Sequence, residues 1–471
     1  MTVATGLRAT VDVAHEASFR RIGPRADGAE LRVGLGRPLR LALLIGREPA
    51  NVAAAHAAAL GACADVVLSL STGSRGSLVD RAGALRDARP DAVLIVSDAR
   101  DPGGMVELVE ALRLGCAGAP EPPALLAAAN DNTRQRIRAS AGPMPVEAMP
   151  VPAAREAREA IVARIRGMRR TDGDLVLRDE AIEGAARSLA VGTSRSTLVI
   201  DVSGASTSLV LATPGGALTA VHSRLGIGAG ADRIVARGGL DRVRRWIPRP
   251  IDGPALLERV FNRARWPDAV PSSVLTLSLE MSLAREAVAQ LLREAERAGI
   301  AVAFLRNARS VVATGDLARF PRAAQTVLVV VDALEPEGTQ LISREHPDAL
   351  VAAGAIASRA TSDVSAAAVA LALVVTLWPN RPASVTVTDG TGETVERVAR
   401  GAFFLMPTTG HVQLGVIGSS DRASADALAL GVVVDARGRP LELPPRDSER
   451  LPTIARWYSA LAALPMEGGP L

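Results

Sequence analysis

The stretch from residue 39 to residue 170 constrains the fold more than any other part of the sequence. Near-continuous apolar segments such as 39–46, 64–70 and 91–98 alternate there with amphipathic segments. Apolar runs of this length, bounded by turn residues, predict buried strands, and the amphipathic segments predict helices. Because the strands are apolar on both faces and helices separate them, we predict a parallel sheet covered on both sides.

Residues 39–170 are therefore expected to form a doubly wound α/β domain of the Rossmann or flavodoxin type. Sheets of this type bind ligands at the carboxyl ends of their strands. The loop 97–104, with the sequence SDARDPGG, lies at such an end and opens a helix. It lacks the GxGxxG spacing of dinucleotide sites, so the loop could be either a structural turn or a ligand-binding loop.

Three further segments complete the predicted domain organisation. Residues 1–38 are expected to form an N-terminal β-ribbon or lead-in, residues 175–380 begin with hairpin strands, and residues 381–471 form a C-terminal β-rich domain. The apolar run 364–378 is shorter than the roughly 20 residues that a membrane span needs. We predict a buried helix for it and no membrane partner.

All 54 basic residues are arginines, because the sequence contains no lysine. This excludes a phosphate-binding P-loop and a kinase active site, which both need a lysine. It also excludes Schiff-base chemistry, including that of pyridoxal-phosphate enzymes. The formal net charge is only +4, and the densest arginine runs, 166–170 and 242–246, are expected to be solvated helix faces. We therefore predict no nucleic-acid partner.

The two cysteines, Cys63 and Cys116, are far apart in the sequence and have no CxxC context. Unpaired thiols are typical of a reducing compartment, and the amino-terminal residues show no signal-peptide pattern. These features predict a cytoplasmic protein.

The segment 198–211, LVIDVSGASTSLVL, is the most informative local motif. A buried strand ends at Asp201, a turn of small residues follows, and a second apolar strand returns. Such a turn lets backbone N–H groups approach a phosphate. An aspartate at the strand end can hold Mg²⁺ through water, and Ser206 or Thr207 adds a hydroxyl donor. An ordinary tight hairpin has a similar sequence, so both interpretations stay open.

Four motifs follow one another in an order that resembles the MutL or GlmL family of glutamate mutase accessory proteins, which is distinct from the mismatch-repair protein of similar name. They are the Asp201 hairpin, the glycine-rich segment 226–239, the strand and turn 308–321, and the segment 332–338, DALEPEG. Family members carry D-V-G-G-A-T-T-D at the hairpin and D-A-[FL]-x-P-E-G further on. The resemblance covers about residues 40–471 and includes 89–113 and 431–444.

The resemblance implies the actin, hexokinase and Hsp70 fold with its ribonuclease H-like core, and residues 175–380 would be its actin-like ATPase-type half-domain. It also implies an accessory or reactivating role beside a cobalamin-dependent glutamate mutase. ATP and Mg²⁺ are the implied cofactors, with Asp201 as the metal-binding residue. The residues implied to contact the nucleotide are Asp201, Gly204, Ser206, Thr207, Gly228 and Gly315.

The chain departs from the family in ways that weaken a nucleotide site. Nothing in residues 1–40 resembles the family's first phosphate hairpin, so one of two half-sites is missing. Ser203 replaces a glycine of the remaining hairpin and Ser208 replaces its final acid. An aspartate, Asp316, follows Gly315 where members have consecutive glycines. Its charge opposes that of a phosphate by roughly 4 kcal/mol at about 4 Å and an effective dielectric constant of about 20. The glycines of the family's upstream loop are replaced by Val96, Ser97 and Asp98.

Other catalytic arrangements are not indicated. No G-x-S-x-G elbow occurs, and no histidine spacing fits a metal pair. Glu335 and Glu337 flank a proline and are expected to be solvated or capping residues. The segment 245–267 places Trp246 and Trp266 beside several arginines, as either a partner-binding surface or internal packing. His222 follows the hairpin and could lie near a bound ligand. The five histidines of the chain are His15, His56, His222, His346 and His411.

Three functions are open at this point. The first is an accessory or chaperone-like protein that binds a protein partner, such as a mutase subunit, and has lost turnover. The second is a weak Mg-ATPase or nucleotide sensor, and the third is a scaffold without a ligand. The missing half-site favours the first, and hence a protein that is not an enzyme.

Overall fold

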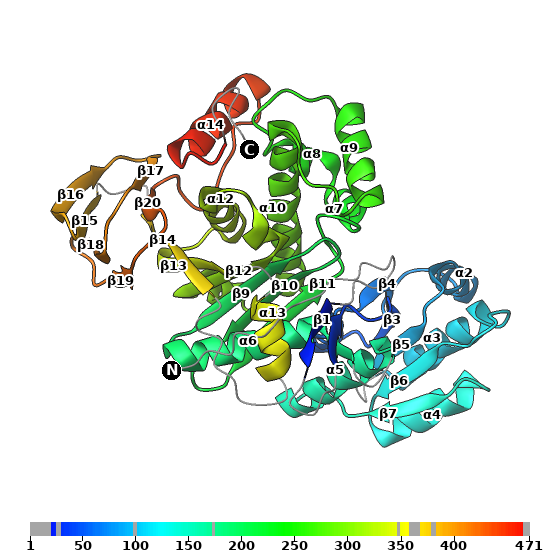
Figure 1. Ribbon diagram of the computed structural model, residues 1–471. Helices are drawn as coiled ribbons and strands as arrows, with labels where there is room; N and C mark the ends of the chain where they lie inside the picture. Colours follow the sequence, from blue (N-terminus) through cyan, green and yellow to red (C-terminus); the bar gives the residue numbers. More distant parts are fainter. Residues whose placement is uncertain are drawn as a thin grey trace. The chain divides into compact units, whose positions relative to one another are not determined.

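The structure is a computed structural model, and it describes residues 20–24, 30–97, 101–171, 175–345, 349–357, 368–377 and 383–464. The chain forms two compact units. The first unit holds the residues up to 179 with two short returns, 221–223 and 293–301. The second unit holds the remainder: 180–220, 224–292 and 302–471. Figure 1 colours the first in blue and cyan and most of the second in green to red.

A five-stranded parallel sheet forms most of the first unit, in the order β4-β3-β5-β6-β7. A helix follows each strand, and Leu, Val, Ile and Ala side chains form a separate apolar core on each face. This is the predicted doubly wound sheet. Its elements are β3 (Arg40–Ile45), α1 (Pro49–Gly61), β4 (Asp65–Ser71), α2 (Leu78–Ala88), β5 (Ala92–Val96), α3 (Pro102–Gly115), β6 (Ala124–Ala128), α4 (Asp131–Ala141), β7 (Val146–Met149) and α5 (Arg155–Arg169).

This five-stranded domain is inserted into a smaller sheet. Strands β1 (Arg20–Pro24) and β2 (Glu30–Gly34) are antiparallel, and β8 (Leu175–Leu177) lies parallel to β2. The backbone N–H of Arg37 donates to the carbonyl of Arg169 at 2.9 Å. The segment that enters the insertion is thus bonded directly to the segment that leaves it.

Arg166 and Arg169 are buried, so the expectation of a solvated helix face at 166–170 is wrong. Each places a guanidinium nitrogen 3.0 Å from a carboxylate oxygen of Asp179, which is also buried. Burial alone would raise the pKa of Asp179, but the charges of Arg169 and Arg166 outweigh it and hold that pKa well below its usual range. A buried charge persists only when it is paired, as these are.

An eight-stranded mixed sheet organises the second unit, in the order β11-β10-β9-β12-β13-β14-β20-β17. Strand β9 is antiparallel to β10 and parallel to β12, which is parallel to β13. The strands are β9 (Thr197–Val202), β10 (Thr207–Ala212), β11 (Leu218–Ser223), β12 (Ser310–Gly315), β13 (Gly338–Glu345), β14 (Ala368–Thr376), β17 (Phe403–Met406) and β20 (Gly431–Asp435).

Helices complete the second unit. They are α6 (Arg178–Thr193), α7 (Ala231–Gly238), α8 (Leu240–Arg244), α9 (Gly253–Arg265), α10 (Val274–Arg297), α11 (Val302–Arg306), the 3₁₀ helix η1 (Asp316–Arg319), α12 (Ala323–Leu334), α13 (Ala349–Ala357) and α14 (Asp447–Ala460). None of the helices in the described ranges is both long and apolar enough to traverse a lipid bilayer.

Strand β14 corrects the prediction of a buried helix for 364–378, because the described part of that run is extended. It pairs antiparallel with β13 and parallel with β20, inside the sheet. Its last six residues are buried. A strand covered on both faces is apolar without alternation, which is why its sequence resembles that of a buried helix.

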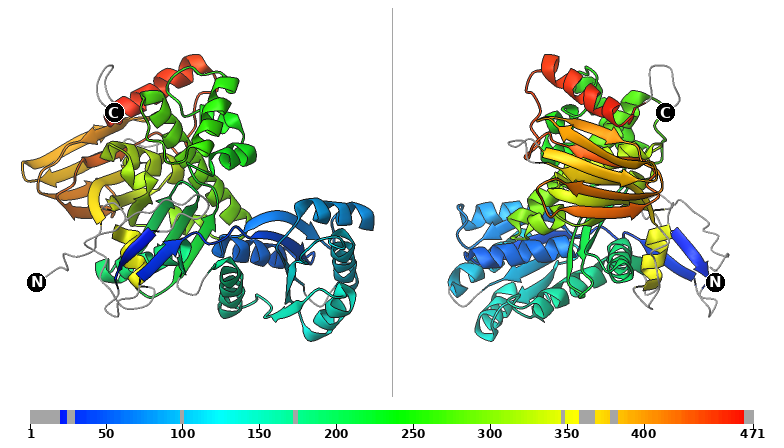
Figure 2. Two further views of the ribbon diagram at one scale, coloured as in Figure 1. Left: turned by 45° about the vertical axis from the view of Figure 1, so that its right-hand side comes forward. Right: turned by 90° about the vertical axis from the view of Figure 1, so that its left-hand side faces the viewer.

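The C-terminal segment adds a second, antiparallel sheet in the order β16-β15-β18-β19. Its strands are β15 (Ala383–Asp389), β16 (Gly392–Val398), β18 (His411–Val416) and β19 (Arg422–Asp426). Apolar side chains from β15 and β18, among them Val385 and Val412, share one core with β14 and β20. The right-hand view of Figure 2 looks onto this β-rich layer, in orange.

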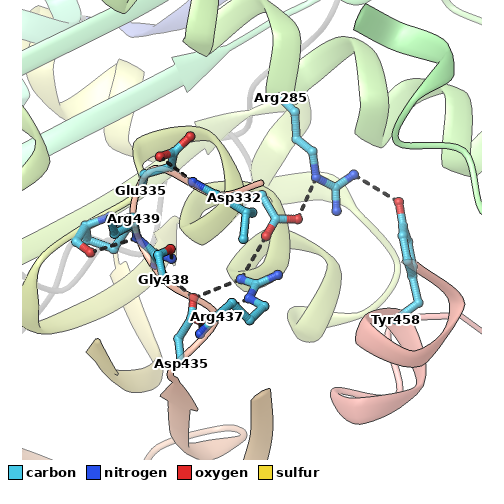
Figure 3. Close-up of polar contacts among 10 residues, drawn as sticks. Arg285, Asp332, Glu335, Asp435, Arg437, Gly438, Arg439 and Tyr458 are labelled. Atoms are coloured by element: carbon cyan, nitrogen blue, oxygen red, sulfur yellow. Dashed lines mark hydrogen bonds and ion pairs between the residues drawn. The ribbon is translucent and has the colours of Figure 1, made fainter. Parts of the chain in front are cut away.

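Buried charges connect four elements at the carboxyl end of α12 (Figure 3). The Asp332 carboxylate lies 2.8 Å from Nε of Arg285 and 2.9 Å from Nη2 of Arg437. Arg285 also donates to the Tyr458 hydroxyl at 2.9 Å. Burial raises the pKa of Tyr458, although the Arg285 charge opposes this. The network joins α10 and α12 to the segment after β20 and to α14.

Asp435 extends this network. It accepts from Arg437 at 2.9 Å and from Arg439 at 2.8 Å (Figure 3). Burial alone would raise the pKa of Asp435, but the two arginine charges hold it well below its usual range. Glu335 has a left-handed backbone at the end of α12, and its carboxylate accepts from the N–H of Leu441 at 3.0 Å. Its side chain thus joins the end of α12 to the segment after β20.

Candidate functional site

Asp201 lies near the carboxyl end of β9, fully buried. Strand β12 runs parallel beside it, with Thr314 opposite Asp201 and Gly315 opposite Val202. Because parallel strands end at the same edge, the β9–β10 turn and the turn after β12 meet there. Such an edge is where α/β sheets place ligands.

The turn between β9 and β10 is held by its own serines. The N–H of Ser203 donates to the carbonyl of Ser206 at 2.9 Å, and the two hydroxyls lie 3.0 Å apart. The Thr207 hydroxyl donates to the carbonyl of Leu225 at 2.7 Å and is fully buried. The Ser206 hydroxyl is therefore engaged within the turn, and the Thr207 hydroxyl joins the start of β10 to Leu225 after β11. Backbone N–H groups are the donors that such a turn offers to a ligand.

The glycine-rich segment after β11 packs against this turn. The N–H of Gly228 donates to the carbonyl of Gly204 at 2.9 Å, and that of Gly230 donates to the same oxygen at 3.2 Å. A Cβ on Gly226 would come within 2.5 Å of Cα of Ala205. No larger residue fits at Gly226 without moving the turn. Helix α7 begins directly after Gly230, so its amino end opens beside the turn.

Gly315 has a left-handed backbone with φ of 71°. A Cβ there would lie 2.5 Å from the carbonyl oxygen of Val202 and 2.6 Å from Oδ1 of Asp201. Only glycine combines this conformation with so close an approach. The N–H of Gly315 donates to the buried carboxylate of Glu345 at 3.0 Å, and the Thr314 hydroxyl donates to the same oxygen. Glu345 also accepts from the N–H of Leu350, at the start of α13.

Two further acids give the site its charge. Asp316 is partly exposed, and one of its oxygens lies 3.6 Å from Arg319. Glu280 of α10 is largely buried, and its carboxylate lies 3.1 Å from Nε of Arg263. The pKa of Glu280 is raised to about 7: burial is the main cause, the Arg263 charge opposes it, and the Asp316 charge adds to it.

The structure brings the predicted residues Asp201, Gly204, Gly228 and Gly315 to one sheet edge. Ser206 and Thr207 lie at the same place, but the Ser206 hydroxyl is engaged with Ser203 and the Thr207 hydroxyl with the carbonyl of Leu225. Sequence reasoning missed Glu345, Glu280 and Arg263. Of these, only Glu345 could have been found from the sequence, because it ends an apolar strand. Glu280 and Arg263 lie on helices far along the chain from the Asp201 hairpin.

Several other sequence candidates lie elsewhere. His222 is fully buried in the first unit, 3.5 Å from Arg166. In the loop 97–104, Asp101 caps α3 by accepting a hydrogen bond from the N–H of Gly104. Asp98, His15 and His346 lie outside the described residues. Trp246 is buried and Trp266 is 62% exposed, so one tryptophan of 245–267 packs inside and the other faces solvent.

A cavity of about 930 Å³ opens elsewhere in the second unit. Arg195 and Arg309, which precede β9 and β12, contribute to its lining together with the exposed face of β15 and β18. It therefore lies at the opposite ends of the strands from Asp201. Arg309 is paired there with Asp421. None of the residues implied to contact a nucleotide lines this cavity, so the glycine-lined turn is the stronger candidate.

No three His, Cys, Asp or Glu side chains within the described ranges are grouped as a metal site. A Mg²⁺ beside Asp201 would take its other ligands from phosphate oxygens and water, which is the usual arrangement for this ion.

The second unit is built on a mixed sheet whose β9–β10 hairpin lies beside the parallel strands β12 and β13. The predicted α/β class is thus confirmed. No protein-family profile matches the sequence, and no curated protein matches it either.

Among solved structures, similar ones include component A of (R)-2-hydroxyglutaryl-CoA dehydratase from Acidaminococcus fermentans, at 12% identity over 55% of this chain and 83% of that one, with a TM-score of 0.23. Another is the activator of 2-hydroxyisocaproyl-CoA dehydratase from Clostridium difficile with bound ADPNP, at 14% identity over 41% of this chain and 69% of that one, with a TM-score of 0.24. A carbohydrate kinase from Novosphingobium aromaticivorans matches at 10% identity over 49% of this chain and 53% of that one, with a TM-score of 0.22. Scores this low carry no argument about function.

Proposed function

We propose that this chain is an accessory protein that binds a nucleotide weakly at the β9–β10 turn and acts through a protein partner. One observation carries the proposal: the glycine turns are retained, while an acid faces them. Gly228 and Gly315 keep the close backbone approaches that a phosphate cradle needs, and Gly204 lies against Gly228. Asp316 points its carboxylate at the same turn and opposes the charge of a phosphate.

The loss of hydroxyl donors supports the same conclusion. Ser206 and Thr207 direct their hydroxyls to protein atoms, so a phosphate would depend on backbone N–H groups and on Mg²⁺ near Asp201. The inserted domain of the first unit is an all-parallel sheet, and none of its described strands forms a second hairpin of this kind. A site with few donors and an opposing acid favours weak binding over turnover.

The partner is the finer part of the proposal. The order of motifs resembles that of the glutamate mutase accessory proteins, so a cobalamin-dependent mutase is the first partner to test. A tagged, full-length chain would be mixed with purified mutase subunits from the same genome. Retention of a subunit supports this partner, whereas retention of none of them rejects it and leaves the nucleotide proposal standing.

Nucleotide binding is tested by thermal unfolding with and without millimolar Mg-ATP. A ligand at about 100 times its dissociation constant stabilises the native state by roughly 2.7 kcal/mol. We expect a small shift that Asp201→Ala abolishes. A shift that survives Asp201→Ala places binding elsewhere and contradicts the proposed site.

A weak Mg-ATPase is the second candidate, because Asp201 is retained at the strand end in a fully buried position. Phosphate release from ATP separates the two candidates. Steady release that requires Mg²⁺ and is lost in Asp201→Ala favours the ATPase. Binding without release favours the accessory protein, and absence of both favours the ligand-free scaffold.

A further inference from the structure

The cavity of about 930 Å³ in the second unit has no part in the proposed function. Pockets that hold small molecules in proteins span roughly 300–1,000 Å³. Arginines and one acid line this cavity together with hydroxyl, amide and apolar groups; the charged residues are Arg195, Arg309, Arg422 and Glu393. Guanidinium groups gathered in one cavity are suited to bind a carboxylate or a phosphate.

Asp421 fixes the position of Arg309 in the cavity wall. One carboxylate oxygen of Asp421 pairs with the Arg309 guanidinium, and the other accepts from the hydroxyl of buried Thr339 at 3.0 Å. Gly338 has a left-handed backbone with φ of 74°, and a Cβ there would lie 3.0 Å from that second oxygen. The last glycine of the segment DALEPEG thus leaves room for the acid that holds Arg309.

Arg309 remains able to bind a ligand. Its side chain is 60% exposed, and a guanidinium has more N–H donors than one carboxylate oxygen engages. Because Asp421 already restricts its conformations, less conformational entropy is lost when an anion binds.

The other two arginines of the cavity have no such partner. Arg195 precedes β9, Arg422 is the first residue of β19, and both are exposed. Within the described ranges, neither guanidinium is engaged by an ion pair or a hydrogen bond. Three arginines against two acids, Glu393 and Asp421, leave an excess of one positive charge at the site. One carboxylate or phosphate of a ligand would balance this excess.

The outer face of the four-stranded sheet supplies uncharged polar groups to the same cavity. Thr388 of β15, Gln413 of β18 and Ser424 of β19 lie opposite one another across three strands, and all three line the cavity. Glu393 lies opposite Thr388 on β16. Val387 belongs to the core on the other face, as the alternation of a strand requires. This row of donors and acceptors fits a ligand that carries hydroxyl groups.

Gly415 leaves a gap in this polar face. It lies within β18, between Thr386 of β15 and Arg422 of β19. A Cβ on Gly415 would meet no other atom within 4 Å. A glycine inside a strand weakens the strand, and it often marks a place where a ligand approaches the backbone closely. The gap therefore offers room for a ligand beside Arg422.

We propose that this cavity binds a small hydroxylated organic anion, of the class of sugar acids and sugar phosphates. Arg195, Arg309 and Arg422 bind the carboxylate or phosphate, which guanidinium groups recognise through charge-assisted hydrogen bonds. The polar sheet face binds the hydroxyl groups, and Glu393 accepts from one of them. Arg195 and Arg309 precede β9 and β12, whereas Asp201 lies near the other end of β9, so this site is separate from the β9–β10 turn and does not rest on the proposed function.

Isothermal titration calorimetry of the full chain with four probes tests the proposal. The probes are glucuronate, glucose 6-phosphate, glucose and inorganic phosphate. We expect at least one of the two sugar anions to bind about tenfold or more tightly than both glucose and inorganic phosphate, and the tighter of the two identifies the acidic group. If neither sugar anion exceeds glucose, or if inorganic phosphate binds as tightly as they do, the proposal is overturned.

Arginine variants locate the binding. Arg195→Gln and Arg422→Gln should each weaken the tighter sugar anion by about tenfold, because each removes a charge-assisted hydrogen bond. Arg397→Gln is the matched control, since Arg397 is an exposed arginine of the same sheet that does not line the cavity. Equal losses in the control, or none in the other two variants, contradict the site. Loss of binding in Asp201→Ala would place the anion at the β9–β10 turn and would also overturn the proposal.

Gly415→Val tests the gap by filling it. Valine is favoured in strands and would meet no neighbour at its Cβ, so the free energy of unfolding in urea should equal or exceed that of the parent protein. Binding of the sugar anion should nevertheless fall by about tenfold or more. A stably folded Gly415→Val variant that binds as the parent protein does would show that the ligand does not lie against β18.

Discussion

Oδ2 of Asp316 lies 3.7 Å from the point where a side chain on Gly204 would begin. The carboxylate after β12 thus faces the backbone of the β9–β10 turn, where a phosphate would be held. Two negative charges this close repel each other unless a cation lies between them. Under the proposed function, Asp316 is therefore the side chain that most strongly opposes a phosphate at this turn.

Asp316→Asn should therefore bind ATP about tenfold more tightly than the parent protein, because one opposing charge is removed at nearly constant shape. Isothermal titration calorimetry without Mg²⁺ measures this directly. Asp426→Asn, which removes an exposed carboxylate in β19, is the matched control and should have no effect. Unchanged affinity in Asp316→Asn would mean that the phosphate does not approach this turn.

Gly315→Ala should lower the free energy of unfolding by about 2 kcal/mol or more. The left-handed backbone disfavours alanine by about 1 kcal/mol, and the new Cβ would collide with Val202 and Asp201. Gly401→Ala is the control, because Gly401 has a φ of 79° but open space around it. Urea unfolding of both variants separates the collision from the backbone strain; equal losses would show that no collision occurs.

Glu280 should make stability fall as the pH rises from about 4.5 to about 7. Its pKa in the native state is raised to about 7 from a reference value of 4.5. In this window the native state keeps a proton that the unfolded state has lost, so raising the pH favours unfolding. The effect is on the order of 3 kcal/mol. Glu280→Gln should remove this slope in urea unfolding measured at pH 5 and pH 8; a slope equal to that of the parent protein would contradict the assignment.

Asp435→Asn should destabilise the protein by about 3–5 kcal/mol, because Arg437 and Arg439 would keep their buried charges with one anion fewer. The pKa of Asp435 is held below its usual range, so its stabilising effect is present above that range and is lost in acid. Asp447→Asn is the control: Asp447 pairs with Arg450 while half exposed, and its loss should matter by about 1 kcal/mol or less. Denaturant unfolding at neutral pH compares the two variants, and similar losses would mean that the network is not a stabilising one.

The sequence allowed the sheet edge at Asp201 to be predicted, because a buried strand, a small turn and glycines leave local signatures. It did not reveal that the Thr207 hydroxyl points inward, since that depends on where Leu225 lies. The burial of Arg166 and Arg169 was equally hidden. From the sequence, a buried, paired arginine cannot be distinguished from a solvated one, because the pairing depends on where the fold places Asp179. For β14, burial on both faces removed the alternation that identifies a strand.

The backbone hydrogen bond between Arg37 and Arg169 makes the five-stranded domain a replaceable insertion. The chain segments that lead into and out of the five-stranded domain lie side by side at this bond. A short peptide that joins them could therefore replace the domain without breaking the pairing of β2 with β8. Such a module can be gained, lost or exchanged as a block. It also means that the pairing of β2 with β8 forms only after the whole inserted domain has left the ribosome.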